Sequence, residues 1–408
     1  MPGPLRGVRV LDLTRILAGP WATQVLADYG AEVIKVEHPR GGDDTRKWGP
    51  PYARDAQGRD TTESAYFLSA NRGKRSVAID LAREEGQALV RGLAAQVDVL
   101  VENFKVGGLA KFGLAYADLE PLNPRLVYLS ISAFGQDGPD AAAAGYDAMV
   151  QAMGGLMSIT GIADGEPGAG PQKVGVAVAD LMCGMYAVSA ILAALHERHE
   201  SGRGQYIDLA LLDSQVAWLA NQGLNYLMTG QPPVRQGTAH PSIVPYQSFA
   251  TADGHVMLAV GNDAQFARFC AVAGAPELAR DARYATNRER VAHRRELVPV
   301  VAALLRERTS SQWLEALRAA QVPCGPINDL AEVFAGPQVR HRGLRIDQPH
   351  PVAGSVPGVR NPVLFSRTQL AYDRPPPMLG ADTDGVLGEM LGLDGPALAG
   401  LRERGVIA

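Results

Sequence analysis

The sequence predicts an α/β protein whose large domain is a Rossmann-like, doubly wound parallel sheet, accompanied by a smaller α+β domain. Three observations lead to this prediction. Short β-branched segments alternate with amphipathic segments between residues 8 and 132, which is the pattern of βαβ units. At 408 residues, the chain is long enough for two domains. After residue 230 the alternation gives way to a Pro- and Gly-rich segment followed by a hairpin and helices.

The N-terminal segment predicts one strand–helix–strand unit. Residues 8–13 (VRVLDL) and 31–37 (AEVIKVE) are the strands, and residues 21–30 form the helix between them. Gly30 ends this helix, because glycine readily adopts the left-handed conformation found after helix C-termini. The remaining elements of the expected sheet are strands at 75–81, 97–104 and 125–132, with a helix over 82–96.

The loops that follow these strands are the expected ligand-binding region, because ligands of such sheets bind beyond the carboxyl ends of the strands. Basic side chains and free backbone amides there suit a phosphorylated ligand. Neither a GxGxxG sequence after the first strand nor a Walker A sequence is present, so an ordinary NAD or ATP site is not expected. The cations of these loops are Arg15, Arg40, Arg46, Lys74, Arg75, Lys105 and Lys111.

The most apolar stretch of the chain, residues 174–195, contains one charged residue, Asp180. A lone buried carboxylate is costly unless it is paired, hydrogen-bonded or neutralised. The stretch is long enough for a membrane span, but a central Asp is expensive in lipid, which disfavours that interpretation. The residues alone leave two others open: Asp180 is the N-cap of a core helix, or it is a catalytic carboxylate in a dry site.

The second half of the chain predicts a different architecture. Residues 205–230 supply one more strand and an amphipathic helix, and residues 231–249 are a predicted linker. Residues 250–261 form a hairpin around an Asp-Gly turn, and several helices follow within 264–321. From about residue 340 the chain is polar and Pro-rich, so we expect it to pack back on the first domain.

The composition argues against several classes of function. A net charge of −4 gives no reason to expect nucleic acid or an anionic membrane as a partner. Three widely separated cysteines without a CxxC motif indicate a reducing compartment and argue against a zinc site or a disulfide framework. The N-terminus lacks the apolar segment of a signal peptide, so we expect a cytoplasmic protein. From the cysteine spacing we expect no bound metal.

An ordered set of motifs carries a family resemblance. They are LRGVRVLDLTRILAGP (5–20), GAEVIKVEHPRGGDDTR (30–46), NRGKRS (71–76), VENF (101–104), GYDAMVQAMGG (145–155), VGVAVADLMCGMYA (174–187), VPCGPIN (322–328) and PPPMLGADT (375–383). As a set they resemble the class III CoA-transferase (CaiB/BaiF) family, which includes formyl-CoA transferase and 2-methylacyl-CoA racemase. Residues 237–249 (GTAHPSIVPYQSF) resemble its succinyl-CoA:glutarate-type dicarboxylate branch.

The resemblance implies an interlocked, ring-like homodimer in which each subunit is threaded through the other. Residues 1–224 and 336–408 would form the large CoA-binding domain, and residues 225–335 the small domain. The substrates would be an acyl-CoA and a carboxylic acid, with no cofactor beyond coenzyme A itself.

The resemblance also places Asp180 on the family's catalytic aspartate. Its carboxylate would attack the donor thioester, forming a mixed anhydride and free CoA thiolate. The thiolate would then return to give an aspartyl-CoA thioester, and the acceptor acid would repeat the sequence in reverse. Because an anhydride is easily hydrolysed, an apolar and water-excluding surround is what this chemistry needs.

Further positions match the family's CoA-binding residues. Cations there would hold the phosphates, and Phe104 would pack near the adenine. His38 stands where a relative has Arg, which weakens that contact. The matching positions are Ile16, Ala18, His38, Arg40, Arg46, Lys74, Arg75, Asn103, Phe104 and Lys111.

Two positions bear on the acyl substrate. Leu17 stands where oxalate-specific relatives have Gln, so a polar clamp for a very small diacid is missing and a longer acyl chain is favoured. Tyr146 stands where racemases have His; because Tyr is a poor base near pH 7, racemization is disfavoured.

Other residues are candidates for the ends of the acyl pocket. Arg15, Arg235 and His240 lie in or beside the distinguishing loops and are candidates to meet the distal carboxylate of a diacid. Gly261 and Asn262 follow a predicted strand and open a predicted helix, which would suit donors to a developing oxyanion.

The sequence therefore predicts a CoA-transferase that moves CoA from succinyl-CoA, or a similar acyl-CoA, to a C4–C6 dicarboxylate such as glutarate. Two alternatives stay open. One is a 2-methylacyl-CoA racemase of the same family, and the other is a non-catalytic CoA- or nucleotide-binding module.

Overall fold

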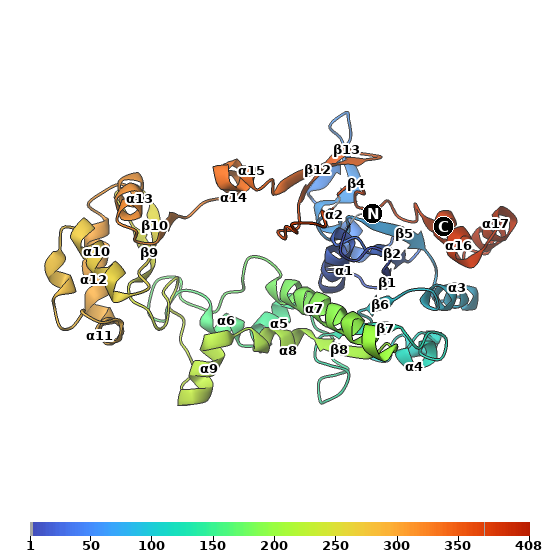
Figure 1. Cartoon of the computed structure of the whole chain (residues 1–408), viewed down its shortest axis with the longest axis horizontal. Coiled ribbons are helices and arrows are strands. Elements are labelled where there is room, and N and C mark those ends of the chain that lie inside the picture. Colours follow the sequence, from blue (N-terminus) through green and yellow to red (C-terminus); the bar gives the residue numbers. More distant parts are fainter. Residues whose placement is uncertain (1–2, 371) are drawn as a thin grey trace. The chain divides into compact units, whose positions relative to one another are not determined.

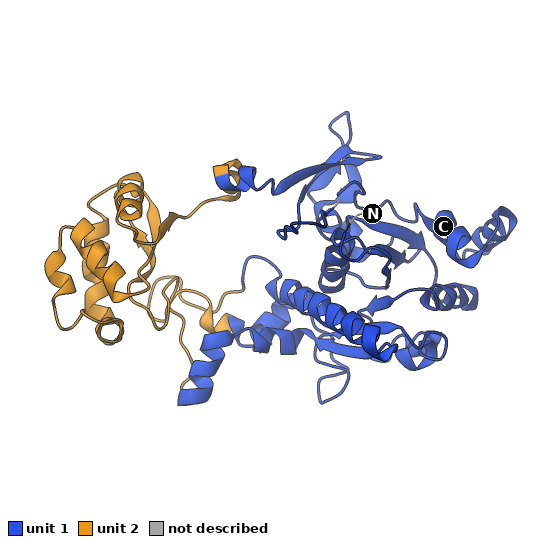
Figure 2. Ribbon diagram, viewed as in Figure 1, with its two compact units in different colours: residues 1–156, 174–229, 338–408 blue, residues 157–173, 230–337 orange. Residues whose placement is uncertain are grey.

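The computed structural model describes residues 3–370 and 372–408. The chain divides into two compact units, which Figure 2 shows in different colours. Unit 1 comprises residues 1–156, 174–229 and 338–408, and unit 2 comprises residues 157–173 and 230–337. Both ends of the chain therefore belong to unit 1, and each unit has its own hydrophobic core.

Unit 1 is built on a six-stranded parallel sheet with the order β5-β2-β1-β6-β7-β8. The strand order reverses between β1 and β6, which makes the carboxyl ends of these two strands the topological switch point. The predicted doubly wound parallel sheet is thereby confirmed. The strands are β1 (Arg9–Asp12), β2 (Glu32–Glu37), β5 (Lys74–Ala78), β6 (Val99–Glu102), β7 (Val127–Ser132) and β8 (Tyr206–Ala210).

Helices cover both faces of this sheet (Figure 1). On one face, α1 (Ala18–Asp28) and α7 (Val178–Ser201) pack against side chains such as Val10 of β1. On the other face, α3 (Glu84–Ala94), α16 (Thr383–Leu391) and α17 (Gly395–Glu403) pack against side chains such as Leu11. Since both faces are buried, the strands are apolar at successive positions rather than alternating.

The C-terminal segment attaches to the edge strand β5. The Ser76 amide donates to the Asp382 carboxylate at 3.0 Å, and the Asp382 amide donates back to the Ser76 carbonyl at 2.9 Å. The Ala78 amide donates to the Thr383 hydroxyl at 3.1 Å, and Ile79 forms a β-bridge with Ile407. The last residues of the chain thus cover a sheet edge that would otherwise be open to pairing.

Unit 2 contains an antiparallel sheet of β9 (Tyr246–Ala250), β10 (His255–Ala259) and β11 (Cys324–Pro326), with β10 in the centre. The predicted hairpin around Asp253 and Gly254 joins β9 to β10. The core of this unit is aromatic, with Phe266 and Trp313 among its buried side chains. Its main helices are α10 (Asp263–Val272), α11 (Asn287–Ala292), α12 (Arg294–Leu305) and α13 (Ser310–Ala319).

The remaining elements are short. Two further hairpins are formed by β3 (Tyr52–Arg54) with β4 (Asp60–Ser64) and by β12 (Arg345–His350) with β13 (Gly354–Val359). The other helical segments are η1 (Asp44–Lys47), α2 (Ala65–Ala70), η2 (Ala110–Phe112), α4 (Tyr116–Leu119), α5 (Asp147–Met153), α6 (Leu156–Ile159), α8 (Leu211–Ala217), α9 (Ala220–Thr229), η3 (Pro276–Ala279), α14 (Leu330–Ala335) and α15 (Pro337–His341).

Several predicted boundaries were wrong. The first helix begins at Ala18 rather than residue 21, and the predicted linker 231–249 ends inside strand β9. The strand predicted over 75–81 ends at Ala78. Helix α7 is long and apolar enough to cross a membrane by length and composition alone, but Cys183, Ala187 and Ile191 are fully buried against the sheet and α1.

The attachment of the C-terminal segment leads to a stability prediction. Leu387 on α16 is fully buried in the core between that helix and the sheet. We expect Leu387→Ala to lower the free energy of unfolding by about 2–5 kcal/mol, because it removes buried methyl groups and leaves a cavity. Leu122→Ala, at a half-exposed leucine of the same unit, is the matched control and should change it little. Denaturant unfolding checks both, and equal losses would contradict the role of α16.

Candidate active site

A cavity of about 330 Å³ lies beyond the carboxyl ends of β1, β6 and β7. Its walls come from the loop after β1, the loop after β6, the segment leading into α5, and α7. Asp180 of α7 is the titratable carboxylate in this wall. The lining residues are Arg15, Ile16, Leu17, Ala18, Asn103, Phe104, Lys105, Val106, Ile131, Ser132, Ala133, Ala141, Ala142, Ala143, Ala144, Gly145, Tyr146, Asp180 and Leu211.

Asp180 is not the N-cap of its helix, and that interpretation was wrong. The N-cap is Ala177, so Asp180 is the third residue of α7. The capping is done by Asp147 at the start of α5, whose Oδ1 accepts hydrogen bonds from the amides of Ala179 at 2.8 Å and Asp180 at 3.3 Å. Gln151 donates to the other oxygen of Asp147 at 2.6 Å. Because Asp147 caps the helix, the Asp180 side chain is left free for another task.

Asp180 is 8% exposed, and within residues 3–370 and 372–408 its carboxyl group has no ion pair or side-chain hydrogen bond. Burial, followed by the nearby charge of Asp147, raises its pKa to about 7. Burial and the charges of Asp180 and Asp147 likewise raise the pKa of Tyr66, on α2, to about 12. Cys183, one turn further along α7, is kept a thiol because burial raises its pKa to about 12. Asp180 is thus poorly solvated when ionised, as a reactive carboxylate should be.

A second cavity of about 270 Å³ adjoins the first and shares Arg15 and Phe104 with it. Its walls are formed by the ends of β1, β2 and β5, and it is mainly apolar. A ligand that runs from Asp180 past Phe104 can enter this second cavity. Its lining residues are Leu13, Arg15, Val36, Glu37, His38, Gly42, Asp43, Ile79, Asp80, Leu81, Ala82, Phe104 and Phe112.

The structure therefore brings together a large part of the residues predicted for the site. Those in the Asp180 cavity are Arg15, Ile16, Leu17, Ala18, Asn103, Phe104 and Tyr146, and His38 lies in the adjoining cavity. Arg40 and Lys111 are exposed on neighbouring loops and line neither cavity.

Three predicted phosphate-binding cations form ion pairs with carboxylates, which argues against that role for them. Lys74 is fully buried, and its ammonium donates to Asp12 at 3.0 Å. Arg46 is buried in a bidentate pair with Glu37, both bonds being 2.8 Å. Arg75 pairs with Glu32 and Glu389 near the amino ends of the strands. Each of the three cations thus has a carboxylate partner, and the pairs of Lys74 and Arg46 are buried while that of Arg75 is partly exposed.

Four further candidates lie in unit 2. Arg235 pairs with Asp164 of the same unit, so its charge is already matched. The Gly261 amide donates to Gln265 at 2.7 Å, and the Asn262 side chain caps α10. Burial and the charge of Arg294 lower the pKa of His240. Because the Gly261 amide already has an acceptor, it is a weaker candidate for an oxyanion donor than the sequence indicated.

Lys105 lines the cavity, Asp147 caps α7, and the pKa of Tyr66 is raised in part by the charge of Asp180, but none of the three was predicted as a site residue. Lys105 was visible as a cation in the loop after β6, and it lines the cavity directly beside Phe104. Tyr66 and Asp147 carried no comparable sequence signal. Asp147 reaches α7 from a helix 33 residues earlier in the chain, and only the folded structure shows this contact.

A buried carboxylate without an ion pair, placed at the switch point of a parallel sheet and lining one of two neighbouring cavities, is the arrangement of an α/β enzyme that acts on its ligand through a carboxylate. The chain belongs to the family described as CoA-transferase family III, whose model matches residues 5–383. This confirms the family that the sequence motifs indicated.

Individual relatives agree with this assignment. The chain is 53% identical to a succinate–glutarate CoA-transferase of Agrobacterium fabrum, over 95% of this chain and 96% of that protein. It is 45% identical to the human succinyl-CoA:glutarate CoA-transferase, over 99% of this chain and 90% of the relative. Among solved structures, a CAIB/BAIF family protein from Brucella suis is similar with a TM-score of 0.83 and 47% identity, covering 96% of this chain and all of that one.

The electrostatics of Asp180 lead to a pH-dependent stability prediction. Because the folded pKa is raised from 3.8 to about 7, the folded state loses stability as the pH rises through this range. Asp180→Asn keeps the shape and removes the buried charge. We therefore expect it to increase the free energy of unfolding by up to about 4 kcal/mol above pH 8, and to change it little near pH 3.

Unfolding curves of the variant and the wild type at several pH values measure this difference. Asp213→Asn, at an exposed position in the first turn of α8, is the matched control and should give a small difference at every pH. If Asp180→Asn destabilises the protein at pH 8, the carboxylate has a stabilising partner and the free-carboxylate description of the site fails.

Proposed function

We propose that this protein transfers CoA from succinyl-CoA to glutarate or a similar dicarboxylate, with Asp180 as the nucleophile. The observation that carries the proposal is the buried Asp180 carboxylate, which has no cationic partner among the residues that the structure describes and which lines the cavity together with residues matching the family's CoA positions. The high identity to two glutarate CoA-transferases over nearly the full chain supports the same substrates.

In the first half-reaction, a carboxylate oxygen of Asp180 attacks the thioester carbonyl carbon of succinyl-CoA. The carbon–sulfur bond breaks, the sulfur leaves as CoA thiolate, and a succinyl-aspartyl anhydride remains. The thiolate then attacks the aspartyl carbonyl carbon, which releases succinate and leaves an aspartyl-CoA thioester.

The second half-reaction reverses these steps with the acceptor. A glutarate carboxylate attacks the aspartyl thioester carbonyl, expels the thiolate and forms a glutaryl-aspartyl anhydride. The thiolate attacks the glutaryl carbonyl, which gives glutaryl-CoA and restores the Asp180 carboxylate. Because the anhydrides hydrolyse easily, water has to be kept from them, and the alanines at 141–144 give part of the cavity wall an apolar surface.

The groups around Asp180 suggest how the substrate lies. Phe104, shared by both cavities, would pack against the CoA moiety, while Asn103 would fix the adjoining backbone. Arg15 is half-exposed, pairs with Asp44 at 3.1 Å and lines both cavities. We assign it, or Lys105 beside it, to the negative charges of the substrate, since both cations reach the cavity wall.

We further propose that the protein is a cytoplasmic homodimer with interlocked chains. The support is a set of large apolar side chains that are more than half exposed in the single chain, far more than isolated surface residues would explain. Three free cysteines fit a reducing compartment. The exposed set includes Tyr146, Val216, Leu224, Leu227, Met228, Val234, Leu330 and Leu364.

The transfer reaction is tested by mass spectrometry of CoA esters. The protein is incubated with succinyl-CoA and a panel of free diacids and monoacids, and glutaryl-CoA is the expected product with glutarate. We expect Asp180→Ala to lower the rate at least about 10³-fold, because the nucleophile is removed. Asp213→Asn is the control and should retain the wild-type rate.

Three results would overturn the proposal. If no acid accepts CoA from succinyl-CoA, the donor assignment fails. If solvent deuterium enters the α-position of a branched acyl-CoA instead, the protein is a racemase. CoA binding without turnover in either the wild type or Asp180→Asn would make it a binding module.

The interlocked dimer predicts a property that an ordinary dimer lacks. Light scattering should give about twice the 43.3 kDa of one chain, with no monomer on dilution. Two differently tagged preparations should form no mixed dimers when combined in the native state, because threaded chains cannot separate without unfolding. Mixed dimers should form after joint denaturation and refolding. Rapid exchange under native conditions would contradict threading.

A further inference from the structure

The loop between β1 and α1 contains an unusual backbone conformation. Ile16 has a φ of 73°, in the left-handed region that β-branched residues avoid. The residue is half-buried and lines the Asp180 cavity together with its neighbours Arg15, Leu17 and Ala18. Such a conformation persists only where the surrounding structure fixes it, and it is common at functional sites.

The backbone groups just before Ile16 are held by side chains from two other parts of the sheet. The Thr14 amide donates to Asp12 Oδ1 at 2.9 Å. The Arg15 amide donates to Asn103 Oδ1 at 2.9 Å, and its carbonyl accepts from Asn103 Nδ2 at 2.7 Å. Asn103 follows β6, so the loop is tied to the neighbouring strand across the switch point.

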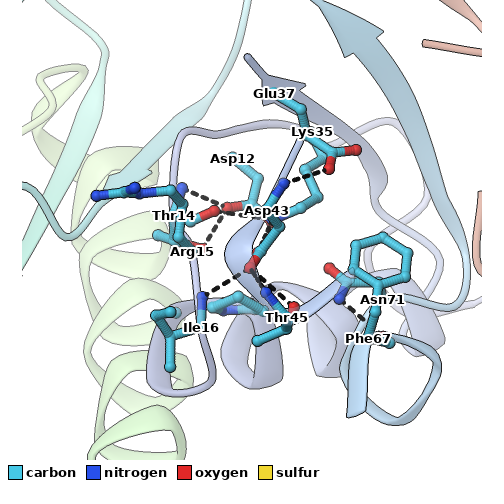
Figure 3. Close-up of polar contacts among 12 residues, drawn as sticks. Asp12, Thr14, Arg15, Ile16, Lys35, Glu37, Asp43, Thr45, Phe67 and Asn71 are labelled. Atoms are coloured by element: carbon cyan, nitrogen blue, oxygen red, sulfur yellow. Dashed lines mark hydrogen bonds and ion pairs between the residues drawn. The ribbon is translucent and has the colours of Figure 1, made fainter. Parts of the chain in front are cut away.

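The strained residue itself is held by a buried ion pair (Figure 3). Asp43 Oδ1 accepts a hydrogen bond from the Ile16 amide at 3.2 Å, while its Oδ2 lies 3.0 Å from Lys35 Nζ. Lys35 in turn donates to the Thr14 carbonyl at 2.8 Å. The ion pair therefore holds the loop at Thr14 and at Ile16, the two neighbours of Arg15.

Asp43 and Lys35 are both completely inaccessible in their side chains. Burying such a pair costs desolvation that its attraction does not generally exceed, so stability alone does not explain it. The other contacts of Asp43 also come from donors, namely the amide and hydroxyl of Thr45 at 3.0 and 2.8 Å. The carboxylate is thus surrounded by four donors, and no neutral side chain can satisfy all of them.

We propose that the buried Asp43–Lys35 pair is a positioning device that holds Ile16 in its left-handed conformation and so fixes the wall of the Asp180 cavity formed by residues 15–18. Neither residue of the pair is a catalytic group: Lys35 lines neither cavity, and Asp43, although it lies in the wall of the second cavity, has a fully inaccessible side chain whose bonds go to Lys35, Ile16 and Thr45. The inference rests on the proposed function in that the fixed wall serves the acyl-CoA substrate.

Asp43→Asn is the first test. Whichever way the amide is turned, its NH₂ group faces a donor, either Lys35 or the Ile16 and Thr45 amides. The substitution therefore breaks hydrogen bonds that hold the loop but keeps the volume of the side chain. We expect kcat/KM for succinyl-CoA to fall about 10²-fold through misplacement of the cavity wall. Binding of CoA, measured by calorimetry, should weaken about 10-fold or more.

Asp28→Asn is the matched control. Asp28 is also a buried carboxylate of unit 1 in an ion pair, with Arg72 at 2.7 Å, but it lines neither cavity. It should lose thermal stability as Asp43→Asn does, while kcat/KM and CoA binding stay within about twofold of the wild type. If both variants lose CoA binding equally, the effect is general destabilisation and the proposal is overturned.

Ile16 provides a second test that does not depend on Asp43→Asn folding. Glycine adopts a positive φ without strain, whereas alanine does not. We expect Ile16→Gly to have a higher Tm than Ile16→Ala, the reverse of the order found at ordinary positions. Asp43→Asn combined with Ile16→Gly should lose less kcat/KM than the product of the two single losses. A higher Tm for Ile16→Ala, or strict additivity, would overturn the proposal.

The two proposals fail in distinguishable ways. If the wild type transfers no CoA but binds it, and Asp43→Asn weakens this binding while Asp28→Asn does not, the positioning role stands and the proposed reaction falls. If the wild type transfers CoA and Asp43→Asn is as active as the wild type, the reaction stands and the positioning role falls.

Discussion

The site depends on keeping one charge out of water without giving it a counter-ion. Among the buried carboxylates of residues 3–370 and 372–408, only Asp180 and Glu102 lack an ion pair, and Glu102 accepts hydrogen bonds from Ser130 and the Phe104 amide. Asp180 has no such compensation. The fold permits this because Asp147 caps α7 in its place, and because the long apolar helix is anchored along the sheet by residues such as Cys183 and Ile191. Burying Asp180 costs free energy, but it also makes the carboxylate more reactive, because a poorly solvated carboxylate loses less solvation when it attacks an acyl carbon than a hydrated one does.

The buried cations near the site, unlike Asp180, each have a partner of opposite charge. Lys74 with Asp12, Arg46 with Glu37, and Lys35 with Asp43 are all buried and matched. The Lys35–Asp43 pair joins the loop after β1 to the loop after β2, while Lys74–Asp12 joins β5 to β1 and Arg46–Glu37 ties the segment after β2 back to that strand. A cavity wall made of loops is mobile unless something holds it, and at this edge of the sheet buried ion pairs perform that task. Lys74 and Arg46, which look like ligand-binding groups in the sequence, are thus part of the scaffold.

This explains how far the sequence could predict the molecule. The parallel sheet followed from strand and helix periodicity, and Asp180 was conspicuous as the single charge in an apolar stretch. The errors have a common physical cause, which is that a sequence shows a charge but not its partner. Lys74 was assigned to phosphate because it lies in a basic loop and matches a CoA-binding position of the family, and its partner Asp12, 62 residues away, gives no sign in the sequence of being beside it. Asp147 was missed as the cap of α7 for the same reason. The strain at Ile16 was also missed, because nothing in the residues around this isoleucine indicates a positive φ.

The strained loop and the unpaired carboxylate can be understood as two halves of one arrangement. A carboxylate that attacks a thioester needs the acyl carbon at a fixed distance and angle, and small misplacements are costly in rate. Helix α7 fixes Asp180 because its first turn is tied to Asp147 and the rest of the helix is packed in the core. The opposing requirement, a fixed position for the substrate, falls on residues 15–18, which carry no regular structure until α1 begins at Ala18. Rigidity there has to come from side chains, and Asp12, Lys35, Asp43 and Asn103 supply it from three different strands or their ends. Placing the site at the switch point is what makes this possible, because only there do the ends of β1, β2 and β6 come close enough for their side chains to hold the same short loop.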